Sequence, residues 1–140
     1  MGNREYRLTI PAVISKIEEA CEHVGKIARK IGLDDDATYH CHLSVEEVLT
    51  NVIEHGYDYA GADKTIDIEC TVTANSFVIT IIDEAEPFDP LSLPDPDPNT
   101  PLLEREGGGW GVFFVKKYMD HVSYRLDHNR NHFIMEKLLK

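Results

Sequence analysis

Cysteine is scarce in this 140-residue sequence, and the three that occur, Cys21, Cys41 and Cys70, lie far apart and form no CxxC pair. An odd number of isolated cysteines argues against a disulfide framework and against a zinc site. Each cysteine falls in a segment with a helix or strand pattern, so we expect free thiols buried in the core.

Long apolar segments are also missing. No run approaches the roughly 20 apolar residues that a membrane-spanning helix needs, and the first residues lack the apolar core of a signal peptide. The sequence therefore predicts a cytoplasmic protein that makes no membrane contact.

Positive charge is in short supply, because 14 Lys and Arg residues face 25 Asp and Glu residues and leave a formal net charge of -11. Proteins that grip nucleic acid without sequence preference use Lys and Arg to neutralise phosphates, so direct nucleic-acid binding is not expected. An acidic surface suits protein partners, or a nucleotide held through a cation. The chain length fits one domain, 1–140, with its own hydrophobic core.

Apolar periodicity predicts both helices and strands. Helices are expected at 11–32, where Pro11 marks the start and Gly32 the end, at about 37–55, and at 112–120. Strands are expected at 6–10, 66–72, 77–82, 122–126 and 133–138. Helices and strands that alternate in this way indicate an α/β fold.

Residues 84–108 show no periodicity and contain six prolines. Proline excludes a regular helix or a central strand, and a loop this long inside a small domain is functional or disordered. Interspersed Phe88 and leucine residues favour a partly docked lid over a disordered insertion.

A row of polar residues lies along one face of the second predicted helix. Its members step by three, four and four residues, so they project from one helix face; they are Ser44, Glu47, Asn51 and His55. Neighbouring apolar residues would hold the helix against a core and leave the polar row at the edge of a cleft. A solvated helix face is the simpler alternative.

Glycines cluster where the last helix begins, at Gly107, Gly108, Gly109 and Gly111. The free N–H groups and the positive dipole end of a helix N-terminus suit a phosphate. No Gly-Lys-Ser/Thr follows and no strand leads directly in, so neither a P-loop nor a dinucleotide-binding fold fits.

Three signals occur in order along the chain: Glu47-x-x-x-Asn51 on a helix, Asp83-Glu84-Ala85-Glu86-Pro87-Phe88-Asp89-Pro90 after a strand, and Gly107-Gly108-Gly109-Trp110-Gly111 before a helix. Together they resemble the three boxes of the GHKL ATPase superfamily. Over nearly the whole chain the sequence is similar to the small anti-sigma-factor serine/threonine kinases of that superfamily. The resemblance implies a two-layer α/β sandwich of the Bergerat type, with a mixed, largely antiparallel sheet and three helices on one face.

The resemblance also implies residue roles. Asn51 would coordinate Mg2+, for which an amide oxygen is a suitable ligand, and Glu47 would be the general base toward a substrate hydroxyl. Glu46 is the rival carboxylate, but it points about 100° away around the helix. Asp83 would accept a hydrogen bond from the adenine amino group.

Further positions of the three boxes would surround ATP. Arg105 matches a basic, catalytic lid residue near the terminal phosphate, and His55 either reaches the phosphates or stabilises the helix end. The complete ATP-binding set implied by the resemblance is Asn51, His55, Asp83, Ala85, Pro87, Phe88, Gly107, Gly108, Gly109 and Gly111.

Two positions depart from the family pattern. Ala85 stands where glycine is usual, so its methyl group could crowd the adenine or conflict with a positive φ. Trp110 replaces an aliphatic residue between the last two glycines.

The resemblance implies an ATP- and Mg2+-dependent protein serine/threonine kinase that acts as an anti-sigma factor. Its partners would be an anti-sigma-factor antagonist, which it phosphorylates, and a sigma factor, and the family suggests a homodimer. One alternative is a non-catalytic module of the same fold that holds a protein partner and binds nucleotide weakly or not at all. Another is an ATPase in which Glu47 activates water.

Overall fold

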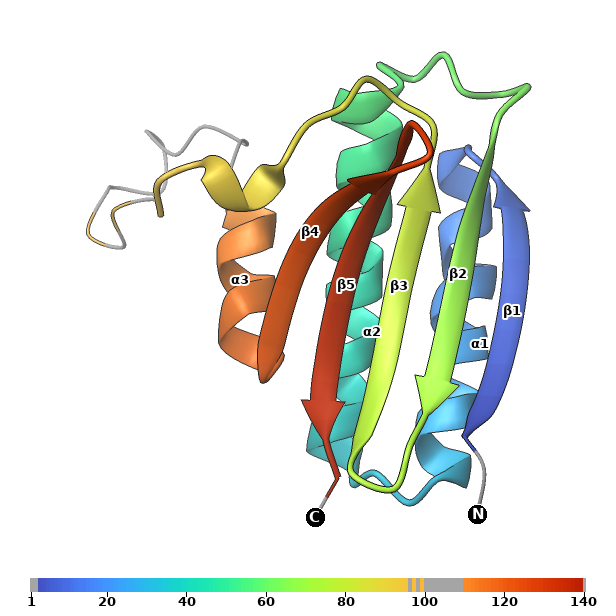
Figure 1. Ribbon diagram of the computed structural model, residues 1–140, viewed down its shortest axis with the longest axis vertical. Helices are drawn as coiled ribbons and strands as arrows, with labels where there is room; N and C mark the ends of the chain where they lie inside the picture. Colours follow the sequence, from blue (N-terminus) through green and yellow to red (C-terminus); the bar gives the residue numbers. More distant parts are fainter. Residues whose placement is uncertain (1–2, 96, 98, 100–109, 140) are drawn as a thin grey trace.

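The computed structural model describes residues 3–95, 97, 99 and 110–139, and strands from both ends of the chain meet in one five-stranded sheet (Figure 1). The strand order is β1-β2-β3-β5-β4. The strands are β1 (Arg4–Pro11), β2 (Thr65–Val72), β3 (Ser76–Asp83), β4 (His121–Asp127) and β5 (Arg130–Leu138). Every pairing is antiparallel, so the sheet lacks the parallel pairs of the expected mixed arrangement.

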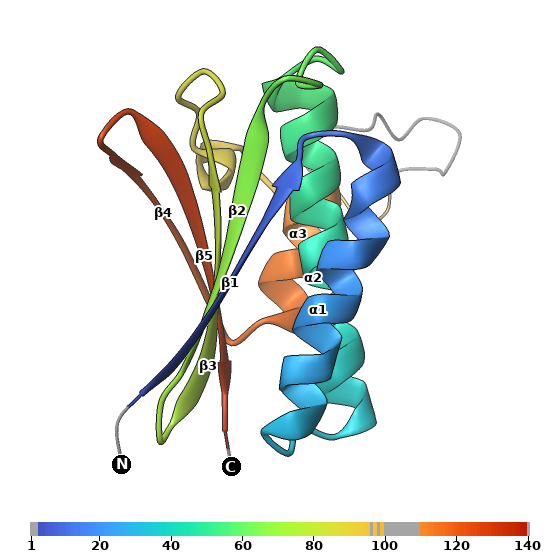
Figure 2. The same ribbon diagram turned by 90° about the vertical axis from the view of Figure 1, so that its right-hand side faces the viewer.

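Helices cover one face of this sheet and leave the other face without a helical layer (Figure 2). They are α1 (Ile17–Lys30), α2 (Asp35–Asn51) and α3 (Trp110–Tyr118). The predicted two-layer α/β sandwich is therefore confirmed. No helix among the described residues is long and apolar enough to cross a membrane.

The first helix begins later than predicted. Pro11 is the last residue of β1, where it pairs with Thr65, and a 3-10 turn, η1 (Ile14–Lys16), precedes α1. Proline has no N–H to donate, which an edge strand tolerates, and β1 is an edge of the sheet. The prediction that Pro11 starts the helix is wrong, whereas Gly32 follows α1 as expected and has a φ of 94°.

The core lies between the sheet and the helices. Inward-facing strand residues such as Ile68 and Ile79 pack against α2 residues such as Val45 and Leu49, and all four are fully buried. The three cysteines are free and buried, as predicted. Burial raises the pKa of each thiol to about 12, so these thiols are unreactive parts of the core.

The second helix begins with a side-chain cap and ends in a wider turn. The Asp34 carboxylate accepts a hydrogen bond from the Ala37 N–H at 2.8 Å, which satisfies a free donor of the first turn. After Asn51 the chain continues as a π-helical turn, η2 (Val52–Gly56), in which the Tyr57 N–H bonds the Val52 carbonyl at 2.8 Å. Single π turns occur frequently at functional sites.

Loops from three elements meet at one end of the sheet. The end of η2, the segment after β3 with its 3-10 turn η3 (Pro90–Ser92), and the β4–β5 turn all lie at the top of Figure 1. The described chain ends lie at the opposite end, because Arg4 pairs with Val72 and the Leu139 N–H donates to the Asn75 carbonyl at 2.8 Å. Of the predicted lid at 84–108, the described part is 84–95, 97 and 99.

Candidate functional site

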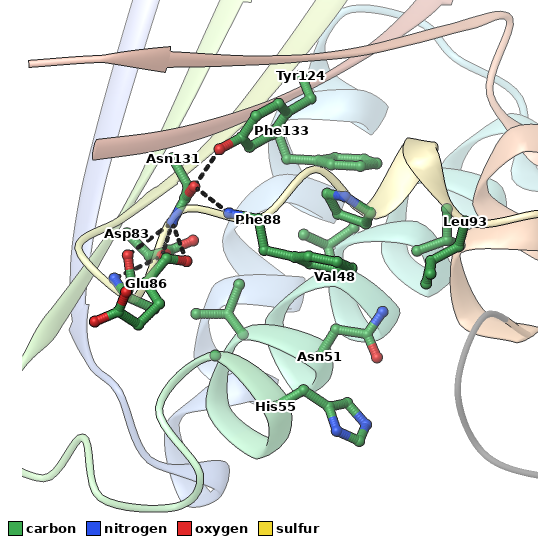
Figure 3. Close-up of a pocket in the computed structure, with 15 residues that line it drawn as sticks. Val48, Asn51, His55, Asp83, Glu86, Phe88, Leu93, Tyr124, Asn131 and Phe133 are labelled. Atoms are coloured by element: carbon green, nitrogen blue, oxygen red, sulfur yellow. Dashed lines mark hydrogen bonds between the residues drawn. The ribbon is translucent and has the colours of Figure 1, made fainter. Parts of the chain in front are cut away.

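A cavity of about 350 Å³ opens where these loops meet (Figure 3). Clefts of this size commonly hold small molecules. Residues from α2, η2, β3, the lid segment, α3 and the β4–β5 hairpin line it: Val48, Asn51, Val52, His55, Gly56, Asp83, Ala85, Glu86, Phe88, Pro90, Leu93, Val112, Tyr124, Asn131 and Phe133. Apolar walls therefore surround a few polar groups.

Asp83 is the buried acid of the cavity, with only 6% of its surface exposed. Its Oδ1 accepts hydrogen bonds from Asn131 Nδ2 at 2.9 Å and from the Ala85 N–H at 2.9 Å. Burial raises the pKa of Asp83, and these two hydrogen bonds act in the opposite direction. Its Oδ2 takes part in no hydrogen bond between described residues, so that oxygen is available to a donor on a ligand.

Ala85 fits this site without strain. It lines the cavity with 8% of its surface exposed, and it is not among the residues with a positive φ, so glycine is not required there. A Cβ placed on Gly56 would come within 3.1 Å of the Ala85 Cβ. Gly56 therefore leaves the room that the alanine methyl group occupies.

The segment after β3 is anchored from two sides. The Glu84 N–H donates to the Tyr57 hydroxyl at 2.8 Å, which ties the segment to the end of η2. The Phe88 N–H donates to Asn131 Oδ1 at 3.3 Å, which ties it to β5. The loop that carries Ala85 is thus held between η2 and β5.

Glu47 and Asn51 lie one turn apart on α2, against the start of α3. A Cβ placed on Gly111 would come within 2.6 Å of Glu47 Oε2 and 3.6 Å of Asn51 Nδ2. Glycine at position 111 leaves the space in which the Glu47 carboxylate lies, so Glu47, Asn51 and the last glycine of the glycine-rich segment share one site. Asn51 lines the cavity, and Glu47 lies beside it next to Gly111.

Glu47 is a half-buried carboxyl group with a raised pKa. Burial raises its pKa, and the nearby Glu46 and Glu54 carboxylates raise it further. A carboxylate with a raised pKa accepts a proton more readily near neutral pH. Glu46 is exposed whereas Glu47 is half-buried, which fits the choice of Glu47 over its neighbour.

The remaining predicted residues divide by position. His55, on η2, and Phe88, which is 54% exposed, line the cavity, whereas Pro87 is exposed and does not. Figure 3 shows Asn51 and His55 on one wall, with Asp83 and Asn131 grouped on another. Arg105, Gly107, Gly108 and Gly109 lie outside the described residues, and so does the side chain of Trp110.

Ser44 does not belong to this wall, so the prediction that the polar row forms one accessible face is wrong at that residue. Ser44 is fully buried, and its hydroxyl has no hydrogen-bond partner among the described residues. The reason is that α3 packs across α2 near this level, where the rings of His40 and Tyr118 stack with centroids 4.7 Å apart.

Asn131, Tyr124 and Phe133 line the cavity but are not predicted from the sequence. Asn131 sits in a His-Asn-Arg-Asn segment that reads as a turn. The antiparallel register pairs it with Asp83 across β3 and β5, and that register is not visible in the sequence. An alternating pattern in β4 and β5 could have marked Tyr124 and Phe133 as inward-facing, though not as cavity residues.

Comparison with known proteins finds two similar protein kinases. A serine-protein kinase RsbW of Halalkalibacterium halodurans is 27% identical over 124 residues, which cover 86% of this chain and 75% of that protein. A serine-protein kinase RsbW of Oceanobacillus iheyensis is 24% identical over 128 residues, which cover 88% and 80%.

A solved structure of RsbU and RsbW domains from Mycobacterium tuberculosis has the same fold. It matches with a TM-score of 0.67 at 14% identity, over 96% of this chain and 32% of that longer chain. The model of the histidine kinase-like ATPase domain family matches residues 10–137, a range that contains α1, α2, α3 and nearly all of the sheet. The chain therefore belongs to the histidine kinase-like ATPase domain family.

Proposed function

We propose that this protein is an ATP- and Mg2+-dependent protein serine/threonine kinase that acts as an anti-sigma factor and phosphorylates an anti-sigma-factor antagonist. Support comes from the family, from relatives named serine-protein kinase that match most of the chain, and from the three sequence boxes. We further propose a single domain over 1–140 with a lid at about 84–108, a cytoplasmic location, and a homodimer that sequesters a sigma factor.

One observation carries this proposal. The cavity has a buried carboxylate acceptor, Asp83, on one wall, and it has Asn51 on the other. Glu47 adjoins Asn51 where Gly111 leaves space for them. A nucleotide whose adenine amino group donates to Asp83 and whose phosphates reach Gly111 would meet the Glu47 carboxylate and the Asn51 amide at its reactive end.

The residues suggest how the chemistry proceeds. Asp83 Oδ2 accepts a hydrogen bond from the adenine amino group and orients ATP. Glu47 takes the proton of a serine or threonine hydroxyl as that oxygen bonds the γ-phosphorus. The bond between the γ-phosphorus and its bridging oxygen breaks, and ADP leaves with the bonding electron pair.

A magnesium ion fits the groups present. Mg2+ is usually held by one or two protein oxygens together with water and substrate phosphates, and the Asn51 amide lies beside the space that Gly111 leaves open. The described residues contain no cluster of three or more His, Cys, Asp or Glu side chains suited to a metal. We propose that Asn51 holds the ion, which when bound would neutralise phosphate charge.

The test is transfer of labelled phosphate from ATP to a candidate antagonist. We expect Glu47→Gln to lower transfer by about 10²- to 10⁴-fold, the usual contribution of a general base, while Mg-ATP affinity stays within a few-fold of wild type. Glu46→Gln, which removes the same charge one residue away on the exposed side, should leave transfer nearly unchanged.

Three outcomes would redirect the assignment. Transfer that survives Glu47→Gln at the wild-type rate rejects Glu47 as the base. If calorimetry detects no Mg-ATP binding by the wild-type protein, the non-catalytic binding module becomes the better description. Phosphate release in the absence of any protein substrate, at a rate matching transfer, would favour an ATPase.

A further inference from the structure

We infer that Asn131 is a positioning residue of the nucleotide site, which acts through Asp83 and the loop after β3 without touching the nucleotide. This inference rests on the proposed nucleotide function. It concerns a residue outside the three sequence boxes, contributed by the β4–β5 hairpin.

The amide nitrogen of Asn131 donates hydrogen bonds to several acceptors of the site. Asn131 Nδ2 donates to Asp83 Oδ1 at 2.9 Å, to the Ala85 carbonyl at 3.0 Å and more weakly to the Glu86 carbonyl at 3.4 Å (Figure 3). An amide nitrogen has two hydrogens. Both are therefore committed to holding the carboxylate and the loop.

The amide oxygen of Asn131 also has hydrogen-bond partners within the protein. It accepts from the Phe88 N–H at 3.3 Å and from the Tyr124 hydroxyl. A backbone N–H only donates and a backbone carbonyl only accepts, so the contacts to Phe88 and Ala85 allow one orientation of the amide. Because every strong donor and acceptor of the side chain is already used, Asn131 influences a ligand through the groups it holds.

The sheet fixes this arrangement. Asn131 and Asp83 are direct partners in the antiparallel pairing of β5 with β3, so their side chains stand next to each other on one face. Each is only 6% exposed. Hydrogen bonds in such a buried setting are strong, and a group that loses its partner there stays without one.

These hydrogen bonds fix the orientation of the Asp83 carboxylate. With Oδ1 held by Asn131 and by the Ala85 N–H, rotation of the carboxylate is blocked and Oδ2 remains the oxygen for a ligand. The same hydrogen bond favours the ionised carboxylate against the effect of burial. Removal of the amide should therefore weaken recognition of the adenine amino group, even though no nucleotide contact is lost.

The decisive variant is Asn131→Asp, which replaces the donor with a second carboxyl beside Asp83. Two carboxylates that share a site repel each other, so the pair loses its last proton only at a pH well above the usual carboxyl range, and below that pH one of the two stays protonated. Once protonated, the introduced carboxyl can donate to Asp83 as the amide does. By calorimetry with Mg-ATP we expect affinity about 10- to 100-fold below wild type at pH 8, and recovery to within about threefold of wild type at pH 6.

Two further variants make the result specific. Asn131→Ala removes the amide without adding charge, so its affinity should be about 10-fold below wild type at both pH values. Asn129→Asp adds the same charge in the exposed β4–β5 turn, at a positive φ that aspartate tolerates, and should bind as wild type does. The inference is overturned if Asn131→Ala binds within twofold of wild type, or if the Asn131→Asp deficit is equal at both pH values.

A readout without nucleotide separates this inference from the proposed function. Carbon-13 NMR titration of the side-chain carboxyls of Asn131→Asp should show a coupled pair, with one pKa well above the usual carboxyl range. Two independent, ordinary titrations would overturn the inference. If wild type binds no Mg-ATP while the pair still titrates as coupled, the nucleotide function fails and the positioning of Asp83 by Asn131 stands.

Discussion

Gly111 shows how a residue without a side chain can make room for its neighbours. Its missing Cβ leaves the space in which the Glu47 carboxylate and the Asn51 amide lie. The family resemblance implies that Gly111 belongs to a phosphate-binding loop, a role in which the backbone matters. In the structure its absent side chain matters for the neighbouring helix as well.

We predict that Gly111→Ala lowers phosphate transfer about 10- to 100-fold while changing Mg-ATP affinity less than threefold. The added Cβ would lie 2.6 Å from Glu47 Oε2, and the carboxylate, at the end of a flexible side chain, would have to move from its position. A misplaced general base costs rate more than binding. Steady-state kinetics with ATP and the antagonist, alongside calorimetry, separates the two effects.

Gly25→Ala is the matched control for this variant. Gly25 lies within α1, and a Cβ added there meets no atom within 4 Å. Alanine in a helix is favoured over glycine by about 1 kcal/mol, so this control should be at least as stable as wild type and fully active. A normal rate in Gly111→Ala would show that the Glu47 carboxylate has room elsewhere in the site.

Separation along the chain explains which site residues could be predicted from the sequence. Glu47 and Asn51 follow from helical spacing and family resemblance, because their relation is local in sequence. Asn131 depends on a contact with Asp83 between residues 48 positions apart. Helix and strand periodicity predicts only contacts between residues that are close in sequence. The contact between Asn131 and Asp83 depends on the register of β3 with β5.

At the scale of elements, one ion pair ties strands across the face of the sheet that the helices leave open. Arg130 Nη2 on β5 donates to Asp67 Oδ2 on β2 at 2.6 Å, so the pair spans the intervening β3. Asp67 is the register partner of Ile82, which is only 2% exposed although it lies outside the main core cluster. The pair thus joins β2 and β5 across β3.

We predict that Asp67→Asn lowers the free energy of unfolding by about 1 kcal/mol at pH 7, with a loss that shrinks in acid. Burial acts to raise the pKa of Asp67, but hydrogen bonds from Thr9 and Arg130 outweigh it and hold the pKa below its ordinary value of 3.8. A lowered pKa contributes stability above the unfolded value, and that stability is lost as pH falls through the folded value.

Urea denaturation from pH 7 to pH 3 measures this dependence. The difference between wild type and Asp67→Asn should be constant above about pH 5 and should shrink as pH falls toward about 3. Glu69→Gln is the comparison, because Glu69 pairs with Arg7 at a more exposed site, with side chains 37% and 62% exposed. Its effect should be less than half as large, since water screens exposed pairs, and an equal effect would contradict the role given to burial.

The elements themselves were largely predictable, and the exceptions have physical causes. Alternation and helical periodicity locate the strands and helices because each element has one buried face. Pro11 reads as a helix start but ends an edge strand, since the two settings tolerate a missing N–H equally. The π turn at Val52–Gly56 continues the apolar pattern of α2, so nothing in the sequence separates it from an α-helix.

At the scale of the whole molecule, the negative net charge opposes the binding of a negatively charged nucleotide. The chain carries a formal charge of -11, which repels a bare triphosphate, so the cation should contribute strongly to affinity.

We predict that Mg-ATP at about 100 times its dissociation constant raises the melting temperature by about 8 °C. A ligand at that concentration contributes about 2.7 kcal/mol, and a domain of this size gains about 3 °C per kcal/mol. ATP with a chelator in place of Mg2+ should give less than half of that shift. Differential scanning fluorimetry measures both conditions.

Asp83→Asn provides the control for this shift. Its amide oxygen can still accept from Asn131 and from the Ala85 N–H, whose bonds go to Oδ1 in the wild type, so the protein should fold with an unchanged or higher melting temperature. The atom opposite the adenine amino group becomes a donor, so most of the Mg-ATP shift should vanish. A full shift in this variant would place the nucleotide elsewhere.

The overall architecture follows from the sequence only in part. Alternating helices and strands indicate an α/β fold, and the family resemblance implies its two layers. The hairpins β2–β3 and β4–β5 are local. The insertion of β5 between β3 and β4 is set by packing of the hairpins against α2 and α3, which no local pattern encodes. That strand order is what brings Asn131 to the cavity.

The position of the chain ends has a consequence for fusion proteins. Asn3 and Leu139 lie at the end of the sheet remote from the cavity, separated from it by the length of β3, eight residues or about 26 Å. A flexible tether needs about 20 residues to span that distance on average. A substrate domain joined through fewer than about eight residues, which span less than about 26 Å even when fully extended, would be out of reach of its own active site and would be phosphorylated only by another copy. Linker length alone could therefore switch such a fusion between intermolecular and intramolecular transfer.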